Sequence, residues 1–280
     1  MNALELQHLN KTYNGFQLHD LNLTLPSGCI MGLIGENGAG KSTTIRLILN
    51  MIQRDSGTIT VLGKDNREAF EITKQDIGVV VDEVGFPECL TAEQINKIMR
   101  STYQNWDEKR YFDYLKQLSV PCKKAFKEFS RGMKMKLGIA VALSHDAKLL
   151  ILDEATSGLD PVVREEVITL FSEFTRDERH AVLISSHIVS DLEKICDYIA
   201  FLHKGELLLC EEKDRLLERY GIIQCTHAQM QELDPDAIVS THVSDYNAEA
   251  IVDRNQIPTG FRVNPIGIEE LFVSMIKGAR

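Results

Sequence analysis

The sequence predicts an α/β fold built around a largely parallel β-sheet. Residues 29–34, 149–152 and 181–184 are short, almost wholly apolar runs, which is typical of strands buried on both faces of a sheet. A helical period over residues 162–175 separates the last two runs, and this strand–helix–strand order is typical of parallel sheets. A glycine-rich segment follows the first run and leads into a helical pattern over residues 43–49, which also indicates this class.

The first 80 residues predict further strands. Residues 4–9 and 16–25 alternate apolar and polar side chains, as half-buried strands do. Asn14 and Gly15 between them predict a turn, and residues 58–63 predict another strand.

The middle of the chain changes to a helical pattern. From about residue 88 to residue 147 the apolar period is that of helices, and we expect the side chains of Trp106, Tyr111, Phe112 and Leu115 on one helix face.

The last third predicts mixed structure. Residues 199–209 predict a hairpin that turns at Lys204 and Gly205. A helix is expected near residues 213–220, then short strands, and finally an amphipathic helix around residues 267–277.

The glycine-rich segment is a phosphate-binding loop. It fits the pattern Gly-x-x-x-x-Gly-Lys-Ser/Thr with the residues Gly35, Glu36, Asn37, Gly38, Ala39, Gly40, Lys41 and Ser42. Its glycines let successive backbone N–H groups point at an anion, and the following helix adds the positive end of its dipole. We expect Lys41 to reach the β- and γ-phosphates and the Ser42 hydroxyl to ligate Mg²⁺. The loop therefore predicts binding of a nucleoside triphosphate.

Two carboxylates follow the second buried run. Asp153 and Glu154 stand where a parallel strand would end beside the phosphate-binding loop. Asp153 can hold Mg²⁺ through its water shell. Glu154 points elsewhere and can polarise an attacking water, which a general base accelerates by about 10²–10⁴-fold.

The charge balance of the chain limits the classes of partner that it can bind. The chain has 280 residues and a net charge of −10, and its last 70 residues hold seven Lys and Arg against twelve Asp and Glu. Phosphate backbones need an electropositive face, so we expect no nucleic-acid partner. We interpret one basic run as the solvated face of the helical region; its members are Lys123, Lys124, Lys127, Arg131, Lys134 and Lys136.

Cysteine usage and hydropathy indicate the compartment. The six cysteines, at positions 29, 89, 122, 196, 210 and 225, form no Cys-x-x-Cys pair, which fits a reducing cytosol. The N-terminus lacks the charged-then-apolar plan of a signal peptide, and no uncharged apolar run approaches about 18 residues. If the protein works at a membrane, we expect another chain to supply the span.

Together these motifs resemble those of the ATP-binding subunit of an ABC transporter, in family order over roughly residues 3–210. The matching segments are the Walker A loop at 35–42, the signature segment at 130–133, the Walker B strand and catalytic glutamate at 149–154, the D-loop at 157–160 and the switch histidine at His187. Tyr13 lies where the family stacks an aromatic ring on adenine.

The resemblance implies a P-loop NTPase of the ABC type. Residues 1–84 and 149–210 would form the catalytic core, with a RecA-like parallel sheet and an antiparallel β subdomain. Residues 85–148 would form a helical subdomain that carries the signature, and residues 211–280 a small C-terminal α+β extension.

It also implies ATP and Mg²⁺ as cofactors. The residues implied to bind ATP are Tyr13, Gly35, Glu36, Asn37, Gly38, Ala39, Gly40, Lys41, Ser42, Thr43, Ser130, Arg131, Gly132, Met133 and Asp160. The implied metal ligands are Ser42, Asp153 and Asp82, and the implied catalytic residues are Glu154, His187 and Lys41. Asp160 is expected to hold His187 across a subunit interface.

The family's arrangement implies two partners. The signature segment faces the ATP of an opposite subunit, so a second ATP-binding subunit is expected. A membrane-spanning permease is the other, which places the chain at the cytoplasmic face of the membrane. We expect the permease to dock around residues 82–90, which are apolar yet predicted to be exposed.

The sequence departs from the common family pattern at three positions. Asp82 stands where glutamine is usual, and its carboxylate keeps an oxygen for Mg²⁺. Arg131 and Met133 stand where the signature usually has glycine and glutamine. This wording, like the acidic tail, resembles the branch that exports drugs, antibiotics and peptides.

The alternative to a transport subunit is a soluble ABC-type ATPase that acts in translation, repair or cofactor assembly. Repair members need long coiled-coil insertions and translation members carry two nucleotide domains in one chain, and the sequence shows neither. A GTPase needs an Asn-Lys-x-Asp motif, and the run from Asn96 and Lys97 ends in Met99.

Overall fold

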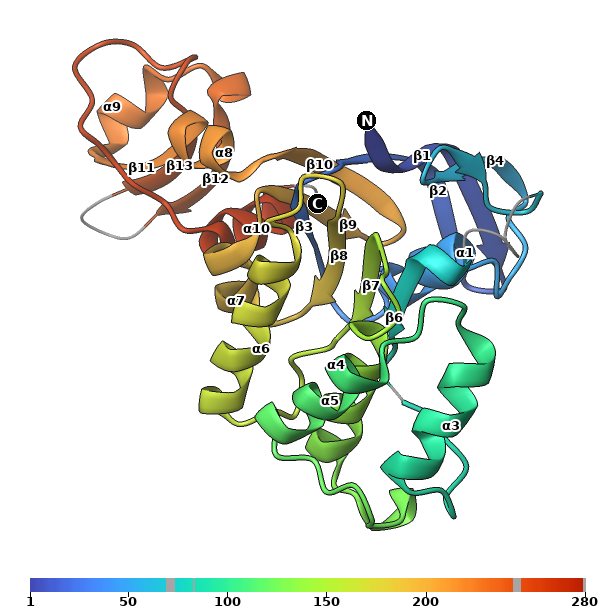
Figure 1. Ribbon diagram of the computed structural model, residues 1–280. Coiled ribbons are helices and arrows are strands. Elements are labelled where there is room, and N and C mark those ends of the chain that lie inside the picture. Colours follow the sequence, from blue (N-terminus) through green and yellow to red (C-terminus); the bar gives the residue numbers. More distant parts are fainter. Residues whose placement is uncertain (69–73, 83, 244–247, 279–280) are drawn as a thin grey trace.

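A six-stranded sheet lies at the centre of the computed structural model, which describes residues 1–68, 74–82, 84–243 and 248–278 (Figure 1). Its strand order is β10-β9-β3-β8-β7-β6, and all neighbours are parallel except the antiparallel pair β9 and β10. The strands are β3 (Ile30–Gly35), β6 (Ile77–Val80), β7 (Leu149–Asp153), β8 (Ala181–Ser186), β9 (Tyr198–His203) and β10 (Glu206–Glu212). The predicted α/β class is confirmed, as is the hairpin at Lys204 and Gly205, whose φ angles are +47° and +85°.

This sheet separates two apolar layers. Every residue of β3, β7 and β8 is buried, as the apolar runs predict. Successive side chains of a strand point to opposite faces. Ile30 and Leu150 accordingly pack into one cluster with the helices α5 (Arg131–Ala142) and α6 (Pro161–Phe174), and Met31 packs into the other. The second layer also contains α1 (Lys41–Ile48).

An antiparallel sheet covers the second layer. Its order is β2-β1-β4-β5, formed by β1 (Asn2–Tyr13), β2 (Phe16–Pro26), β4 (Ser56–Val61) and β5 (Lys64–Asp65). β1 is longer than the predicted 4–9 because irregular pairing with β2 lets it continue to the turn at Gly15. This turn places the start of β2 beside the phosphate-binding loop: a Cβ at Gly40 would lie 3.0 Å from Phe16.

The helical region contains α3 (Ala92–Thr102), α4 (Glu108–Gln117) and α5. Tyr111 and Leu115 are buried in the main core, as predicted. Trp106 does not share their helix, because Asp107 caps the N-terminus of α4 by accepting a hydrogen bond from Arg110 N. The Trp106 indole instead donates to Asn96 on α3, at 2.8 Å.

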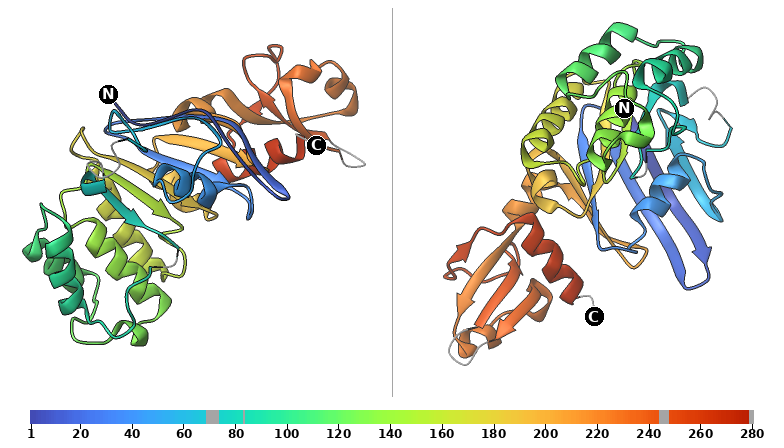
Figure 2. Two further views of the ribbon diagram at one scale, coloured as in Figure 1. Left: turned by 90° about the vertical axis from the view of Figure 1, so that its right-hand side faces the viewer. Right: turned by 90° about the horizontal axis from the view of Figure 1, so that it is seen from below.

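The C-terminal residues form a lobe around a third, antiparallel sheet (Figure 2). Its order is β12-β13-β11-β14, with β11 (Tyr220–Cys225), β12 (Ile238–Val243), β13 (Ala248–Asp253) and β14 (Val263–Asn264). The helices of this part and its connection are α8 (Lys213–Arg219), α9 (His227–Gln231) and α10 (Ile268–Gly278), whereas α7 (Val189–Ile195) joins β8 to β9. Short 3-10 turns occur at Lys74–Asp76, Phe126–Glu128 and Pro235–Ala237.

The last helix ties this lobe to the central sheet. Phe272 of α10 packs on Phe201 of β9 with ring centroids 5.0 Å apart, and Ile268 is fully buried in the main core. Dividing the chain into catalytic, helical and C-terminal parts stays our interpretation. Among the described residues, no helix is both long enough and apolar enough to cross a membrane.

Candidate functional site

The phosphate-binding loop connects β3 to α1, as predicted. Gly38 and Gly40 have φ angles of +81° and +115°, in the region that side chains other than glycine rarely adopt. A turn within the loop is closed by a hydrogen bond from Ala39 N to Glu36 O at 3.1 Å. Gly35 is required for a different reason, because a Cβ there would lie 2.6 Å from Leu202 O. The loop therefore leads into the N-terminus of α1, the end of a helix that attracts anions.

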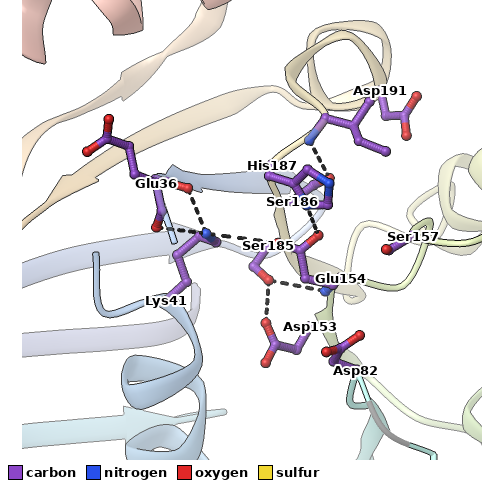
Figure 3. Close-up of polar contacts among 12 residues, drawn as sticks. Glu36, Lys41, Asp82, Asp153, Glu154, Ser157, Ser185, Ser186, His187 and Asp191 are labelled. Atoms are coloured by element: carbon purple, nitrogen blue, oxygen red, sulfur yellow. Dashed lines mark hydrogen bonds and ion pairs between the residues drawn. The ribbon is translucent and has the colours of Figure 1, made fainter. Parts of the chain in front are cut away.

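Lys41 is buried beneath this loop with only 7% of its side chain exposed. Its ammonium donates to Gly35 O at 2.6 Å and to Glu36 O at 3.3 Å (Figure 3). Burial lowers the pKa of Lys41, while the nearby carboxylates of Glu154 and Asp153 oppose that shift. The ammonium is held by neutral carbonyl groups and lies 3.9 Å from the closest carboxylate, Glu154 Oε1. It is therefore a desolvated cation suited to a phosphate.

Asp153 ends β7 and is buried. The Ser185 hydroxyl, on the neighbouring strand β8, donates to Asp153 Oδ1 at 2.6 Å. The same hydroxyl accepts a hydrogen bond from Glu154 N at 3.2 Å, and Ser185 O accepts one at 3.1 Å. Ser185 thus orients the Asp153 carboxylate and the backbone at Glu154, a role that its place at a strand end does not reveal in the sequence.

Glu154 has a φ angle of +54°, which is rare for a residue with a long side chain. Such strained backbone is concentrated at functional sites. The turn directs the Glu154 carboxylate away from Asp153 and toward His187, whose Nδ1 lies 2.6 Å from Glu154 Oε2 (Figure 3). His187 follows β8, and its side chain is 52% exposed. The ends of three adjacent strands therefore bring Lys41, Glu154 and His187 together.

These residues face a cavity of about 820 Å³. Its walls are formed by Gly15, Phe16, Glu36, Asn37, Gly38, Gly40, Lys41, Ser42, Thr43, Asp82, Arg131, Glu154, Ser157 and His187. Eleven of them are predicted site residues. Sequence reasoning missed Ser157 and Phe16 as individual site residues, since the first was noted only within the D-loop segment and the second only as part of a strand. This volume lies within the range of small-molecule pockets, about 300–1,000 Å³, and the phosphates of a bound nucleotide would lie over Lys41.

Several predicted residues do not line this cavity. Tyr13 is 44% exposed, and the Lys11 ammonium lies 5.2 Å from the centre of its ring. Ser130 caps α5 by accepting from Met133 N at 3.3 Å, and Asp160 caps α6 by accepting from Val163 N at 3.1 Å. Gly132, Met133, Gly35, Ala39 and Asp153 are also outside the lining. Their roles toward ATP stay predictions.

Arg131 does line the cavity of its own chain. Its Nη2 lies 2.5 Å from Asp82 Oδ1 and 3.5 Å from the Ser157 hydroxyl. Two of the three positions that depart from the common family pattern, 82 and 131, are therefore ion-pair partners. Residue 83, next to Asp82, lies outside the described residues.

The predicted metal ligands are oxygen donors, as Mg²⁺ prefers. Ser42 is exposed at the start of α1, Asp82 lines the cavity, and Asp153 has its second oxygen Oδ2 free of the hydrogen bond from Ser185. Within the described ranges no group of three His, Cys, Asp or Glu side chains has a metal-binding arrangement. Mg²⁺ is usually held by one or two carboxylates together with phosphates and water.

Comparison with known proteins identifies the family. The sequence pattern of the family described as ABC transporter matches residues 18–157. The chain is 30% identical to the ABC transporter ATP-binding protein YtrB of Bacillus subtilis (strain 168), over 99% of each chain. It is 35% identical to the lantibiotic transport ATP-binding protein SrtF of Streptococcus pyogenes, over 75% of this chain and 91% of that one.

Solved structures of ATP-binding subunits have the same fold as this chain. The structure of an ATP-binding subunit of an ABC transporter superposes with a TM-score of 0.70 at 26% identity, covering 77% of this chain and 92% of that one. A dimeric, post-hydrolysis ATP-binding cassette bound to ADP and phosphate has the same fold, with a TM-score of 0.68 at 21% identity over 75% of this chain and 98% of that one. The chain therefore belongs to the ABC transporter family and is an ATP-binding ATPase subunit of such a transporter.

Proposed function

We propose that this chain hydrolyses MgATP between its phosphate-binding loop and the pair of Glu154 and His187, and that this drives export of an antibiotic or peptide through a separate membrane-spanning subunit. The observation that carries the proposal is the convergence on Glu154, whose two carboxylate oxygens lie 3.9 Å from Lys41 Nζ and 2.6 Å from His187 Nδ1. One carboxylate thus connects the cation suited to phosphate with the imidazole.

Each side chain has a distinct role in this proposal. Lys41 and the loop N–H groups bind the β- and γ-phosphates. Glu154 accepts a proton from the attacking water, and His187 orients water and γ-phosphate. Ser42, Asp153 and Asp82 would hold Mg²⁺, which supplies positive charge to the phosphate oxygens. The hydrogen bond from the Ser185 hydroxyl orients the Asp153 carboxylate, so a metal would meet a preorganised ligand.

A second ATP-binding subunit completes the site in this proposal. Gly132 and Met133, at the start of α5, would contact the ATP held by the other subunit, as the family's arrangement implies. Tyr13 would stack on adenine, and Asp160 would face the other subunit. ATP then holds two subunits together, and its hydrolysis releases them. The known dimeric cassette of the same fold supports this arrangement.

The membrane-spanning subunit would dock in a groove of about 550 Å³. The groove is lined by Asp82, Val84, Gly85, Phe86, Glu88, Phe126, Arg131, Lys134 and Met135. Its apolar floor includes Phe86 and Phe126, whose rings meet edge to face with centroids 5.7 Å apart. Because Asp82 and Arg131 line both the groove and the nucleotide cavity, a docked partner would contact residues that respond to ATP.

The direction of transport and the class of cargo rest on relatives. SrtF is a lantibiotic transport protein, and the bacitracin transport ATP-binding protein BcrA of Bacillus licheniformis is 37% identical over 71% of this chain and 66% of its own length. These names, with the signature wording at residues 130–134, favour export of peptide antibiotics.

Expression of the chain together with its membrane-spanning subunit in a sensitive bacterium tests this function. We expect the tolerated concentration of bacitracin or of a lantibiotic to rise, and the rise to need both proteins. Lys41→Ala is the matched control, since it should abolish the increase without removing the protein. Hydrolysis of ATP by the purified chain, with no dependence of any resistance on the membrane subunit, would favour the soluble ATPase instead.

A further inference from the structure

The N-terminus of α5 is unusually basic. Arg131 is its first residue and Lys134 follows one turn later, while the first turn contains no acidic residue. A helix N-terminus already carries the positive end of the helix dipole, so two added cations are unfavourable there unless an anion is close. The Lys134 ammonium lies 4.8 Å from the centre of the Phe126 ring, which leaves Arg131 as the cation that needs a carboxylate.

Asp82 provides that carboxylate from another element. It follows β6, the edge strand of the central sheet, and its Oδ1 lies 2.5 Å from Arg131 Nη2. The contact joins residues 49 positions apart. Asp82 therefore connects the central sheet to the helical region at the mouth of the cavity that contains Lys41.

The aliphatic stem of Arg131 packs against a neighbouring backbone segment. A Cβ at Gly158 would lie 3.5 Å from Arg131 Cδ, and a Cβ at Gly132 would lie 3.2 Å from Gly158 O. The start of α5 thus packs closely on the segment that follows Glu154. The Arg131 stem runs along this segment, and its guanidinium reaches the Ser157 hydroxyl as well as Asp82.

We propose that Asp82 alternates between two cations, Arg131 when the nucleotide cavity is empty and Mg²⁺ when MgATP is bound, so that binding of MgATP uncovers the basic N-terminus of α5. The proposal rests on the Mg²⁺ site of the proposed function. The carboxylate has two oxygens, but a metal on either one would lie close to the Arg131 guanidinium, and the repulsion between two cations at one carboxylate favours release of Arg131.

The exposure of the pair suits such an exchange. The side chains of Arg131 and Asp82 are 59% and 47% exposed, and exposed ion pairs are weak. Arg131 therefore lowers the affinity of the site for the metal only slightly, by about two- to fivefold. Once released, Arg131, Lys134 and the free N–H groups of α5 form an anion-binding end. A subunit would thus offer this end to the ATP of the other subunit about two- to fivefold more readily once it holds its own MgATP.

Binding of a non-hydrolysable ATP analogue tests the exchange. Its affinity is measured by calorimetry with excess Mg²⁺ and again with EDTA, at protein concentrations where sedimentation shows monomers. The quantity of interest is the dissociation constant in EDTA divided by the dissociation constant with Mg²⁺, which rises as Mg²⁺ strengthens binding. Arg131→Gln should raise the Mg²⁺-dependent ratio about two- to fivefold and leave the affinity in EDTA unchanged. In an Asp82→Asn background, Arg131→Gln should have no further effect.

Arg100→Gln is the matched control. It removes an exposed arginine of the same helical region, paired with Glu108 at 3.4 Å and 72% exposed, so the ratio should stay at the wild-type value.

A second readout uses the wild-type chain, in which the ion pair between Arg131 and Asp82 is intact. The guanidinium NMR signals of Arg131, assigned with Arg131→Lys, should shift on adding the analogue with Mg²⁺ and stay in place when it is added with EDTA.

The outcomes separate the two proposals. If the wild-type affinity is the same with Mg²⁺ and with EDTA, the Mg²⁺ site of the proposed function is wrong, and the exchange is wrong with it. If the wild type depends on Mg²⁺ but Arg131→Gln leaves the ratio unchanged, only the exchange is wrong. A loss of affinity in both conditions would make Arg131 a direct phosphate contact and would also overturn the exchange.

Discussion

The Glu154 carboxylate and the His187 imidazole form a hydrogen bond of 2.6 Å between residues 33 positions apart. The bond depends on the left-handed turn at Glu154 and on the parallel pairing of β7 with β8. It places the imidazole beside the group that we propose as the base for water attack.

His187→Ala should therefore slow hydrolysis while leaving ATP binding nearly intact. Loss of a group that positions the reacting atoms commonly lowers kcat by about 10²–10³-fold. Single-turnover hydrolysis and calorimetry on the same preparation separate the two effects. His19→Ala, at an exposed site on β2, is the control and should keep wild-type turnover. Weakened ATP binding with an unchanged rate of the chemical step would contradict this role.

Ser185→Ala should disturb both carboxylates at once. The substitution removes the donor to Asp153 and an acceptor for Glu154 N in a fully buried place. Leaving buried polar groups without partners costs about 1–3 kcal/mol. We expect a lower midpoint in urea unfolding and a weaker dependence of ATP binding on Mg²⁺. Ser172→Ala, which removes the hydroxyl of an exposed helix residue that donates to Ile168 O, should change neither property by a comparable amount.

The buried Lys41 ammonium should lower the free energy of unfolding at neutral pH, because burial lowers the pKa of this group. Burial holds this pKa below the ordinary 10.5, so the folded chain loses the proton first as the pH rises. Between the lowered pKa and 10.5 the unfolded chain binds more protons, and stability rises with pH. Below that window the full cost of burying the ammonium is present.

Lys41→Met should accordingly unfold at a higher temperature than the wild type at pH 7, with a difference that shrinks toward pH 10.5. The same variant should lose ATP binding. Thermal unfolding across this pH range measures the difference, and Lys97→Met, at an exposed position on α3, should show no such trend. A wild type that is more stable than Lys41→Met at pH 7 would be inconsistent with a desolvated lysine.

Cys89 offers a test of the docking groove. Among the six cysteines it is the one with an exposed side chain, and it follows Glu88 of the groove. Maleimide should modify Cys89 rapidly in the free chain and at least about tenfold more slowly in the complex with the membrane subunit, because a standard interface excludes solvent from its centre. Mass spectrometry of the labelled peptides gives the rates. Equal rates with and without the membrane subunit would place the partner elsewhere.

The sequence predicted the elements whose patterns are local. The buried strands, the phosphate-binding loop and the hairpin at Lys204 all appear where their patterns indicate, since burial and turn chemistry depend on neighbouring residues. The prediction that Trp106 shares a helix face with Tyr111 was wrong, because the Asp107 cap begins α4 after Trp106 although the apolar spacing continues through it. Such boundaries depend on one hydrogen bond.

Features that depend on distant pairings could not be predicted in the same way. The Arg131 contact with Asp82 joins two segments whose separation along the chain carries no periodic pattern. Phe16 reaches the cavity because the turn that joins β1 to β2 places the start of β2 beside the phosphate-binding loop. The hydroxyl of Ser185 gains its role from the register of β7 with β8. All three follow from tertiary packing and not from local propensity.

The oligomeric state and the hydrolysis rate of the Glu154→Gln variant, both measured with MgATP, test the central claim most directly. The amide keeps the shape of the side chain but cannot accept the proton of the attacking water, so hydrolysis should fall by about 10²–10⁴-fold while ATP still binds. Analytical ultracentrifugation should then show a dimer that needs both ATP and Mg²⁺ and disperses with EDTA. A variant that stays monomeric at every protein and nucleotide concentration, or that hydrolyses ATP at the wild-type rate, would contradict the account.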